Sequence, residues 1–377
     1  MDTAKLPDPV LITRPGPLRN LVDRLERERI LAVDTESNSL YAYREQVCLI
    51  QFSTPNEDIL VDPLALDDLS PLAPLFADPK IEKVFHAAEY DLITLKRDFG
   101  FRFENLFDTM MAARILGWEE VGLGSILKAE FGVQLDKRFQ RANWGQRPLP
   151  RELLSYARLD TRYLIALRRR LQQELQAKGL LALANEDFGR LRHVNGRSPE
   201  NQPDACWRVS GSYDLSGQEA AVLQELCRYR DQVARSLNRP LFKVIGDRAL
   251  LGIAKVAPGD VRDLNRSGLL SPRQLQRHGE ALVRAVRRGL KAEPIYPPRS
   301  PRPEDAYLGR LDALREWRKR KGRDLGVSSD VVIPRDLMYT LVEENPQDAD
   351  TLAQVMKDVP WRLDRFGDEI LAVLEGA

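Results

Sequence analysis

An internal repeat near the C-terminus places the strongest constraint on how this chain can fold. An offset of 88 residues, without a gap, aligns similar residues over about fifty positions: Leu226 with Leu314, Tyr229 with Trp317, Arg230 with Arg318, Ile245 with Ile333, Pro258 with Pro346 and Gly279 with Gly367. Both copies have helical periodicity, so we expect two small helical domains of one fold. A shared apolar pattern predicts a shared fold but not a shared function.

Two stretches divide the 377-residue chain into three predicted domains. Residues 194–212 are rich in Gly, Ser, Pro and Asn, which is typical of a domain boundary. Residues 292–306 contain five prolines and are expected to form a stiff, extended linker. The predicted domains are therefore 1–200, 213–291 and 305–377.

The N-terminal domain alternates strand and helix signals. Short apolar runs predict strands at 30–36, 46–54, 58–62 and 83–87. Helical periodicity predicts helices at 17–29, 89–100, 109–117, 123–132 and about 150–177. Strands interleaved with helices and followed by more helices predict an α/β sheet domain with covering helices.

Composition excludes several classes of protein and of site. No apolar run approaches the roughly 18 residues of a membrane span, and the first residues lack the basic start and apolar core of a signal peptide, so a cytoplasmic protein without a membrane partner is expected. Three Cys without CxxC spacing and only three His disfavour a disulfide framework, a thiolate zinc site or a histidine cluster. Any metal should be a hard cation held by carboxylates.

The overall charge of +1 conceals an uneven distribution. Residues 1–200 carry −2, residues 201–300 carry +7 and residues 301–377 carry −4. The +7 segment is a candidate nucleic-acid surface, although a solvated basic face with no partner would have the same composition. Four basic residues near its end have helical i, i+3, i+4, i+7 spacing and would form one stripe: Arg284, Arg287, Arg288 and Lys291.

Three sequence elements carry candidate catalytic residues. Asp34 and Glu36 end an apolar strand, where positions i and i+2 share a face and two carboxylates repel unless a cation lies between them. Asp91 falls in the first turn of the next helix, and Tyr156 and Asp160 share a helical face at i, i+4 spacing. Each element also has an ordinary structural interpretation: solvated acids at a strand end, an acid that favours the helix dipole, and a surface Asp beside a half-buried Tyr.

Together, the order and types of these elements resemble the ribonuclease D family of the DEDD exonucleases, in the subgroup whose third motif carries a tyrosine. The resemblance runs through ILAVDTE, VCLIQ, VFHAAEYD, LFDT, KRFQRANWGQRPL and YARLDTRYL. The two helical repeats are similar to HRDC domains. This resemblance implies a ribonuclease H-like exonuclease domain with a mixed sheet, followed by two small all-α HRDC-like domains.

The family pattern implies a role for each motif residue. Asp34 would be a ligand shared by two divalent ions, Mg²⁺ or Mn²⁺, and Glu36 and Asp160 would complete the site that holds the nucleophilic water. Asp91 would hold the other ion, partly through water, and Tyr156 would orient the attacking water. The implied activity removes nucleotides from RNA 3′ ends as 5′-monophosphates, with tRNA precursors carrying 3′ extensions as substrates and the enzyme acting as a monomer.

Other conspicuous residues have ordinary structural roles, and two rival functions compete with this interpretation. Asp108 is predicted to cap a helix, and His86 to make a local hydrogen bond rather than to bind metal. Trp144 and Arg147 could contact nucleic acid or pack over the site. Two rival functions are a 3′→5′ DNA exonuclease, which uses the same acids, and a non-catalytic nucleic-acid-binding adaptor; the presence of all four acids and the tyrosine argues against the adaptor.

Overall fold

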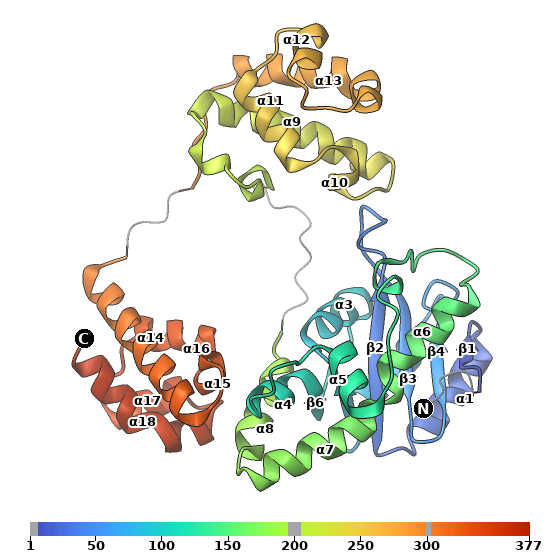
Figure 1. Cartoon of the computed structure of the whole chain (residues 1–377), viewed down its shortest axis with the longest axis vertical. Coiled ribbons are helices and arrows are strands. Elements are labelled where there is room, and N and C mark those ends of the chain that lie inside the picture. The colour runs from blue at the N-terminus through green and yellow to red at the C-terminus, as the bar shows by residue number, and fades with distance from the viewer. Residues whose placement is uncertain (1–6, 195–204, 299–302) are drawn as a thin grey trace. The chain divides into compact units, whose positions relative to one another are not determined.

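A computed structural model describes residues 7–194, 205–298 and 303–377, and the chain divides into two units (Figure 1). The first unit lies within 1–37, 47–197 and 302–377, so the second helical repeat belongs to the same unit as the sheet. The second unit lies within 38–46 and 198–301. The predicted linkers at 194–212 and 292–306 fall partly outside the described residues.

A mixed six-stranded sheet forms the centre of the first unit. The family resemblance implied a mixed sheet, and the sequence predicted four of its strands. Its strands are β1 (Val10–Ile12), β2 (Ile30–Ser37), β3 (Val47–Ser53), β4 (Asp58–Val61), β5 (Glu82–Phe85) and β6 (Leu106–Asp108), in the order β1-β4-β3-β2-β5-β6. The pairs β1–β4, β2–β5 and β5–β6 are parallel, whereas β2–β3 and β3–β4 are antiparallel. The edge strands β1 and β6 were not predicted, because three residues are too few to show periodicity.

Helices cover both faces of the sheet. Leu31 and Val33 of β2 pack in a core that includes α1 (Pro15–Leu25), α2 (Ala73–Ala77) and α3 (Glu89–Phe99). Ala32 packs on the opposite side, in a core built from α4 (Thr109–Ile115), α5 (Leu123–Phe131), α7 (Leu164–Ala177) and α8 (Leu181–Leu191). Since successive strand residues alternate faces, Asp34 and Glu36 continue the Ala32 face, and Thr35 continues the Val33 face.

The long helix predicted at 150–177 is two helices, which corrects that prediction. They are α6 (Arg151–Arg162) and α7, and the break falls at Tyr163, which has φ −99° and ψ −6°. Tyr163 is buried, and its ring packs against Phe131 with the centroids 5.2 Å apart. No Gly or Pro marks this break, so the sequence contains no local signal for it. The helix α8 was also missed.

The helical repeat is confirmed element by element. The first copy comprises α9 (Gly217–Ser236), α10 (Leu241–Val244), α11 (Asp247–Val256), α12 (Val261–Arg266) and α13 (Pro272–Lys291). The second comprises α14 (Asp305–Leu325), α15 (Ser329–Val332), α16 (Arg335–Glu344), α17 (Ala349–Val355) and α18 (Pro360–Glu375), each beginning 88 residues after its counterpart. Even the left-handed residues that follow α11 and α16 correspond, namely Ala257 and Asn345.

A buried ion-pair cluster attaches the second repeat to α8 within the first unit. Arg362 of α18 is 0% exposed, and its Nη1 and Nη2 donate to Glu186 Oε2 at 3.0 Å and Asp187 Oδ2 at 2.9 Å. The guanidinium also donates to the backbone carbonyls of Val331 and Val332, both at 3.0 Å. We call Glu186, Asp187 and Arg362 the Arg362 cluster; it joins the second repeat to the unit that holds the sheet.

The second unit combines the first repeat with residues 38–46, which connect β2 and β3 in sequence. The Tyr43 hydroxyl donates to Asp231 Oδ1 at 2.6 Å, and the Tyr43 amide donates to Asn238 Oδ1 at 3.1 Å. Lys243 lies 3.9 Å from the centroid of the Tyr41 ring. Across the described ranges of both units, no helix combines the length and apolar character that a bilayer crossing requires.

Candidate active site

Three carboxylates meet where β2 ends. Asp34 and Glu36 come from β2 and Asp160 comes from α6, and one oxygen of each lies within 4.8 Å of the others. The alternation of β2 directs both of its acids to the sheet face that α6 covers, and this explains how residues more than a hundred positions apart converge. We call Asp34, Glu36 and Asp160 the three-acid group.

The fourth predicted acid lies beside this group rather than in it. Asp91 is in the first turn of α3, the helix that packs on the Val33 face of the sheet. Its Oδ1 accepts a hydrogen bond of 2.5 Å from the Thr35 hydroxyl, which points to that same face. The charge of Asp91 is nevertheless close enough to raise the pKa of Asp34.

Burial raises the pKa of all four acids, and for Asp34, Glu36 and Asp160 the neighbouring carboxylates raise it further. The pKa of Asp160 rises to about 8 and that of Asp91 to about 7. In the described parts of the chain, none of the four forms an ion pair with a Lys or Arg side chain. Carboxylates that are largely withdrawn from water and share a site in this way favour either a proton or a bound cation between them.

Gln51 is a contributor to the site that the sequence analysis missed. It stands opposite Asp34 in the β2–β3 register, is fully buried, and donates from Nε2 to Asp34 Oδ2 at 3.3 Å. The available signal was an amide within VCLIQFS, a strand whose residues are all buried. A buried amide needs a hydrogen-bonding partner, so such a residue indicates a polar neighbour.

Tyr156 lies one helical turn before Asp160 on α6 and lines the same cavity. Burial raises the pKa of the phenol, and the charges of Asp160, Glu36 and Asp34 raise it further, so the hydroxyl stays protonated at neutral pH. The ring is held between Phe139 and Trp144, with centroids 5.5 and 6.3 Å away. A fixed ring and a protonated hydroxyl make Tyr156 a hydrogen-bonding group and not a base.

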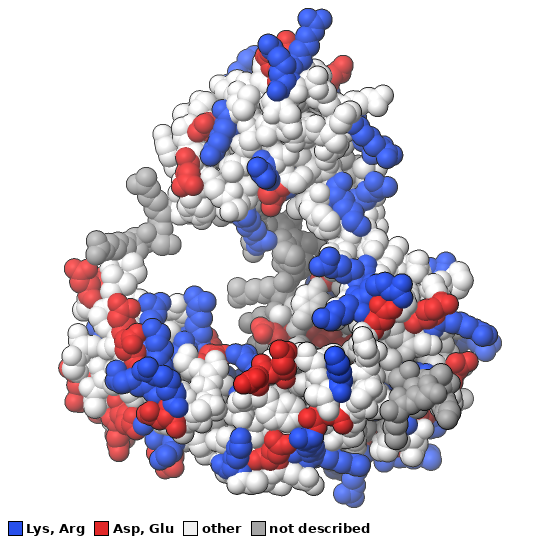
Figure 2. Space-filling model, in the orientation of Figure 1, with Lys and Arg blue, Asp and Glu red and all other residues white. Residues whose placement is uncertain are grey.

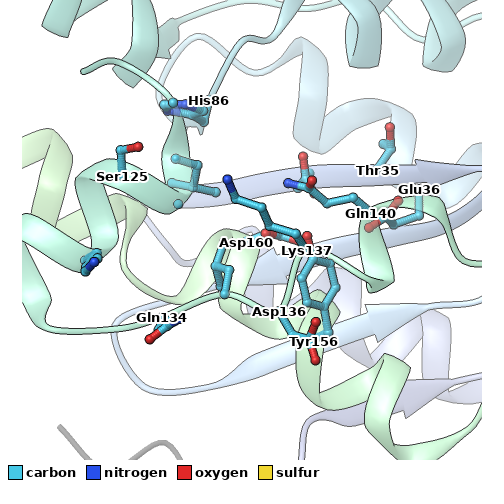
Figure 3. A pocket seen from close by; sticks show the side chains of 16 residues that line it. Thr35, Glu36, His86, Ser125, Gln134, Asp136, Lys137, Gln140, Tyr156 and Asp160 are labelled. Atoms are coloured by element: carbon cyan, nitrogen blue, oxygen red, sulfur yellow. The ribbon is translucent and has the colours of Figure 1, made fainter. Parts of the chain in front are cut away.

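A cavity of about 1260 Å³ opens over the three-acid group (Figure 3). Its volume exceeds the roughly 300–1,000 Å³ of most small-molecule sites. Besides the acids and Tyr156, it is lined by the start of α5 at 122–125 and by polar or basic side chains that include Lys128, Lys137 and Gln140. Lysines and a group of acids that line one cavity suit an extended anionic ligand that meets a cation.

The predictions for neighbouring residues are resolved by their contacts. Asp108 caps α4, accepting from the amides of Met110 and Met111 at 2.8 and 3.0 Å, as predicted. His86 makes the expected local hydrogen bond, 2.9 Å from Nδ1 to Thr109 Oγ1.

Of the two alternatives left open for Trp144 and Arg147, packing describes the structure. Trp144 is 1% exposed. Arg147 forms two 2.7 Å bonds to the carboxylate of Asp62 and a third to the Cys48 carbonyl. Trp144 packs against Tyr156, with the ring centroids 6.3 Å apart, and Arg147 donates to the Trp144 carbonyl at 2.8 Å.

The basic stripe is exposed on α13, but its charges are partly matched. Arg288 Nε donates to Glu225 at 2.8 Å, and Arg287 donates to the Gly259 carbonyl at 2.7 Å. Arg284 lies 3.5 Å from Glu280. The stripe with Lys291 therefore exists as a surface, and its contact with nucleic acid stays a prediction.

Comparison with known proteins agrees with this architecture. A family model described as a 3′-5′ exonuclease matches residues 9–176, and the HRDC domain model matches twice, at 219–286 and 308–374. The ribonuclease D of Gluconacetobacter diazotrophicus is 31% identical, over 99% of this chain and 94% of that protein. The ribonuclease D of Pseudomonas paraeruginosa is 30% identical, over 92% of each.

A solved structure extends the similarity to three dimensions. Escherichia coli RNase D, an exoribonuclease involved in structured RNA processing, matches with a TM-score of 0.71 and 25% identity, over 98% of this chain and 99% of that one. Sequence relatives, matched domain models and this structure all span the exonuclease domain and both repeats. The chain belongs to the ribonuclease D family: it is a 3′→5′ exonuclease with two HRDC domains.

Proposed function

We propose that this exonuclease hydrolyses RNA from the 3′ end with two divalent ions, Mg²⁺ or Mn²⁺, and releases 5′-monophosphates. The observation that carries the proposal is the three-acid group, half-buried to buried beside Asp91, with no cationic side chain paired to it in the described chain. Carboxylate oxygens without His or Cys are the ligands that hard cations prefer.

Each acid has a proposed place around these ions. Asp34, Glu36 and Asp160 would hold one ion, and Asp34 would share the second with Asp91, which reaches it partly through water. When bound, two such ions activate water and stabilise the leaving oxygen of an in-line displacement. Gln51 keeps the shared ligand in place through its bond to Asp34.

Tyr156 and the two lysines that line the cavity are proposed to act on the substrate side. The protonated hydroxyl of Tyr156 would hydrogen-bond the attacking water and orient it toward the phosphorus atom. Lys128 and Lys137 line the same cavity and would offset the negative charge of the phosphates next to the scissile bond.

RNA is proposed as the substrate because the full-length relatives are ribonucleases D and the structurally similar Escherichia coli enzyme processes structured RNA. The specific substrates would be tRNA precursors with 3′ extensions. We assign catalysis to residues 1–200 and the two HRDC domains to 213–291 and 305–377. The stripe of the first HRDC domain would contact phosphates without sequence preference, since it consists of arginine and lysine alone.

Side-by-side digestion tests the proposal. A tRNA transcript with a 3′ extension and single-stranded DNA of the extension sequence would be incubated with the protein in Mg²⁺, in Mn²⁺ and in excess chelator, with Asp34→Asn as the inactive control. We expect mononucleotides from the RNA, stepwise shortening from its 3′ end, and no cleavage in chelator. Faster loss of the DNA would make the chain a DNA exonuclease, and oligonucleotide products would contradict end-wise cleavage.

A further inference from the structure

The two HRDC domains differ in charge at one structurally equivalent position. In the first, Arg230 donates to the Ile245 carbonyl at 3.1 Å and to Asp247 Oδ1 at 2.5 Å. In the second, the equivalent Arg318 donates to the equivalent Ile333 carbonyl, also at 3.1 Å. The residue 88 positions after Asp247, however, is Arg335. The carboxylate that pairs with the arginine in the first domain is thus replaced by a second guanidinium in the second domain.

The extra arginine is held at the surface by an aromatic ring. Arg335 lies 5.4 Å from the centroid of the Tyr339 ring, and its Nη2 donates to the Tyr339 hydroxyl at 3.1 Å. Arg315 of α14 hydrogen-bonds the same hydroxyl. We call Arg315, Arg318, Arg335 and Tyr339 the Tyr339 cluster; it presents three guanidinium groups from α14 and α16 in one place.

Acidic side chains neutralise these positive charges only in part. Burial lowers the pKa of Arg318, and the charges of Arg315 and Arg335 lower it further against the opposing effect of Asp330. Asp330 itself is already ion-paired with Arg114 of α4, which brings a fourth cation to the area. Asp312 pairs with Arg315 at 3.1 Å. Cations therefore exceed acids here, although residues 301–377 as a whole carry −4.

A local excess of arginine in an acidic segment is not a consequence of composition. On the face shown in Figure 2, Lys and Arg side chains gather over the helices labelled α14 and α16 in Figure 1, among acidic neighbours. Like charges held together cost free energy unless an anion binds between them. Arginine forks match phosphate oxygens in pairs, and an adjacent ring offers a face on which a base can stack.

We propose that the Tyr339 cluster is an RNA-binding site of the second HRDC domain, which takes one or two phosphates of the substrate backbone. This inference rests on the proposed ribonuclease function and adds a contact that the net charges of the two HRDC domains do not predict. The Arg362 cluster fixes this domain to α8, so a phosphate bound here is held by the same unit that carries the three-acid group.

The two repeats suggest the variant that tests the site. Arg335→Asp would recreate the Arg230–Asp247 pair of the first repeat around Arg318, so the domain should fold while the cluster loses two units of charge. Arg320→Asp makes the same charge change on an exposed position of α14 outside the cluster. Both would be made in the full-length Asp34→Asn protein, so that bound RNA is not degraded, and the affinity for a 3′-extended tRNA transcript would be measured at two salt concentrations.

Arg335→Asp is expected to weaken binding about five- to tenfold and to flatten the dependence of log affinity on log salt by about 1, as the loss of one or two phosphate contacts predicts. Arg320→Asp should change affinity less than about twofold, because Arg320 makes none of the proposed phosphate contacts. Equal affinities and salt slopes for the two variants would overturn the proposal.

Two further measurements separate a loss of RNA binding from a failure of folding or of catalysis. If Arg335→Asp lowers the melting temperature, the double variant Arg315→Gln, Arg335→Gln would take its place, and an unchanged affinity there would also overturn the site. Cleavage of a short single-stranded RNA by the Arg335→Asp protein with Asp34 restored reports on catalysis alone. Retained cleavage together with weakened tRNA binding supports the site, whereas no cleavage by the parent protein itself would reject the proposed function.

Discussion

Two groups of acids in the same unit show opposite solutions to one electrostatic problem. In the first group, Asp91 and Asp160 are buried and Asp34 and Glu36 are half-buried, and within the described chain no arginine or lysine is paired with any of them. Glu186 and Asp187 are also buried, but both are paired with Arg362. Burial raises the pKa of the acids in both groups.

The neighbours decide the difference. Around Glu186 and Asp187, the charge and hydrogen bonds of Arg362 lower the pKa against burial. Around Asp34, the charges of Asp91, Asp160 and Glu36 add to burial. A buried acid that the chain neutralises itself is part of the fold, whereas a buried acid that the chain leaves unneutralised is available to a cation.

The largest effect on catalysis should appear when one of the proposed metal-binding acids is made neutral. Asp34→Asn or Asp160→Asn removes ligands for the ions, whose stabilisation of transition-state charge amounts to several kcal/mol, so kcat should fall by at least about 10³-fold. In chelator, the same change removes repulsion, and the melting temperature should rise. Turnover of 3′-extended RNA and thermal denaturation would be measured on one preparation. Substantial residual turnover would remove these acids from the catalytic machinery.

The Arg362 cluster should respond in the reverse sense. Arg362→Met leaves two buried acids unpaired and should lower the free energy of unfolding by about 3–5 kcal/mol. Adding Glu186→Gln and Asp187→Asn should recover much of that loss, because a buried ion pair and an uncharged replacement are often similar in stability. Denaturant unfolding of the single and triple variants checks this. A single variant as stable as the parent would show that the cluster does not hold the second HRDC domain.

Tyr156→Phe should separate positioning from metal binding. The ring and its packing against Phe139 and Trp144 are kept, so stability should change little. Loss of the hydroxyl should lower kcat on the order of 10²-fold, within the usual range for a group that positions a reacting water. KM and the dependence on Mg²⁺ concentration should match the parent. Full activity would show that Tyr156 only packs.

The pH dependence of stability tests the absence of a neutralising partner. Because the pKa of Asp160 is raised to about 8 and that of Asp91 to about 7, the folded protein holds protons that the unfolded chain releases at about pH 4. Stability in chelator should therefore fall as pH rises from about 4 to 8. Mg²⁺ should oppose this fall. Melting curves of the parent and of Asp160→Asn, compared across this range, isolate the effect: their difference should grow with pH.

The sequence predicted those features that local patterns encode. The motifs ILAVDTE and YARLDTRYL pointed to Asp34, Glu36 and Asp160 through their resemblance to the ribonuclease D family, and the structure brings the three carboxylates together. The 88-residue offset predicted both helical domains. The Asp108 cap was also recognisable, because its geometry involves only the next three residues.

The missed features depend on contacts between distant segments. Gln51 reaches Asp34 only because β2 and β3 pair in one register, and Asp91 bonds Thr35 because α3 covers the opposite sheet face. The pairing of Arg362 with α8 joins residues about 175 positions apart. Periodicity reports which face of an element is buried and not which other element covers it. A single sequence can therefore indicate that a buried polar side chain such as Gln51 needs a partner, but not which residue that partner is.

The smallest expected effects are on RNA binding by the basic stripe of α13. Here, too, a charge that is paired within the protein can be compared with one that is less well paired. Arg288 is matched by Glu225 at 2.8 Å, with a carboxylate that is largely buried, whereas Arg284 lies 3.5 Å from Glu280, whose side chain is 83% exposed. A guanidinium that is already paired within the protein gains less free energy from binding a phosphate.

If the stripe binds RNA, Arg284→Ala should therefore weaken tRNA binding about two- to threefold and reduce the salt slope by somewhat less than 1. Arg288→Ala should have a smaller effect on both quantities. Filter binding at two salt concentrations, in the Asp34→Asn background, would measure both. Equal and negligible effects would identify the stripe as a solvated face, and a larger effect of Arg288→Ala would show that pairing within the protein does not predict which cations meet RNA.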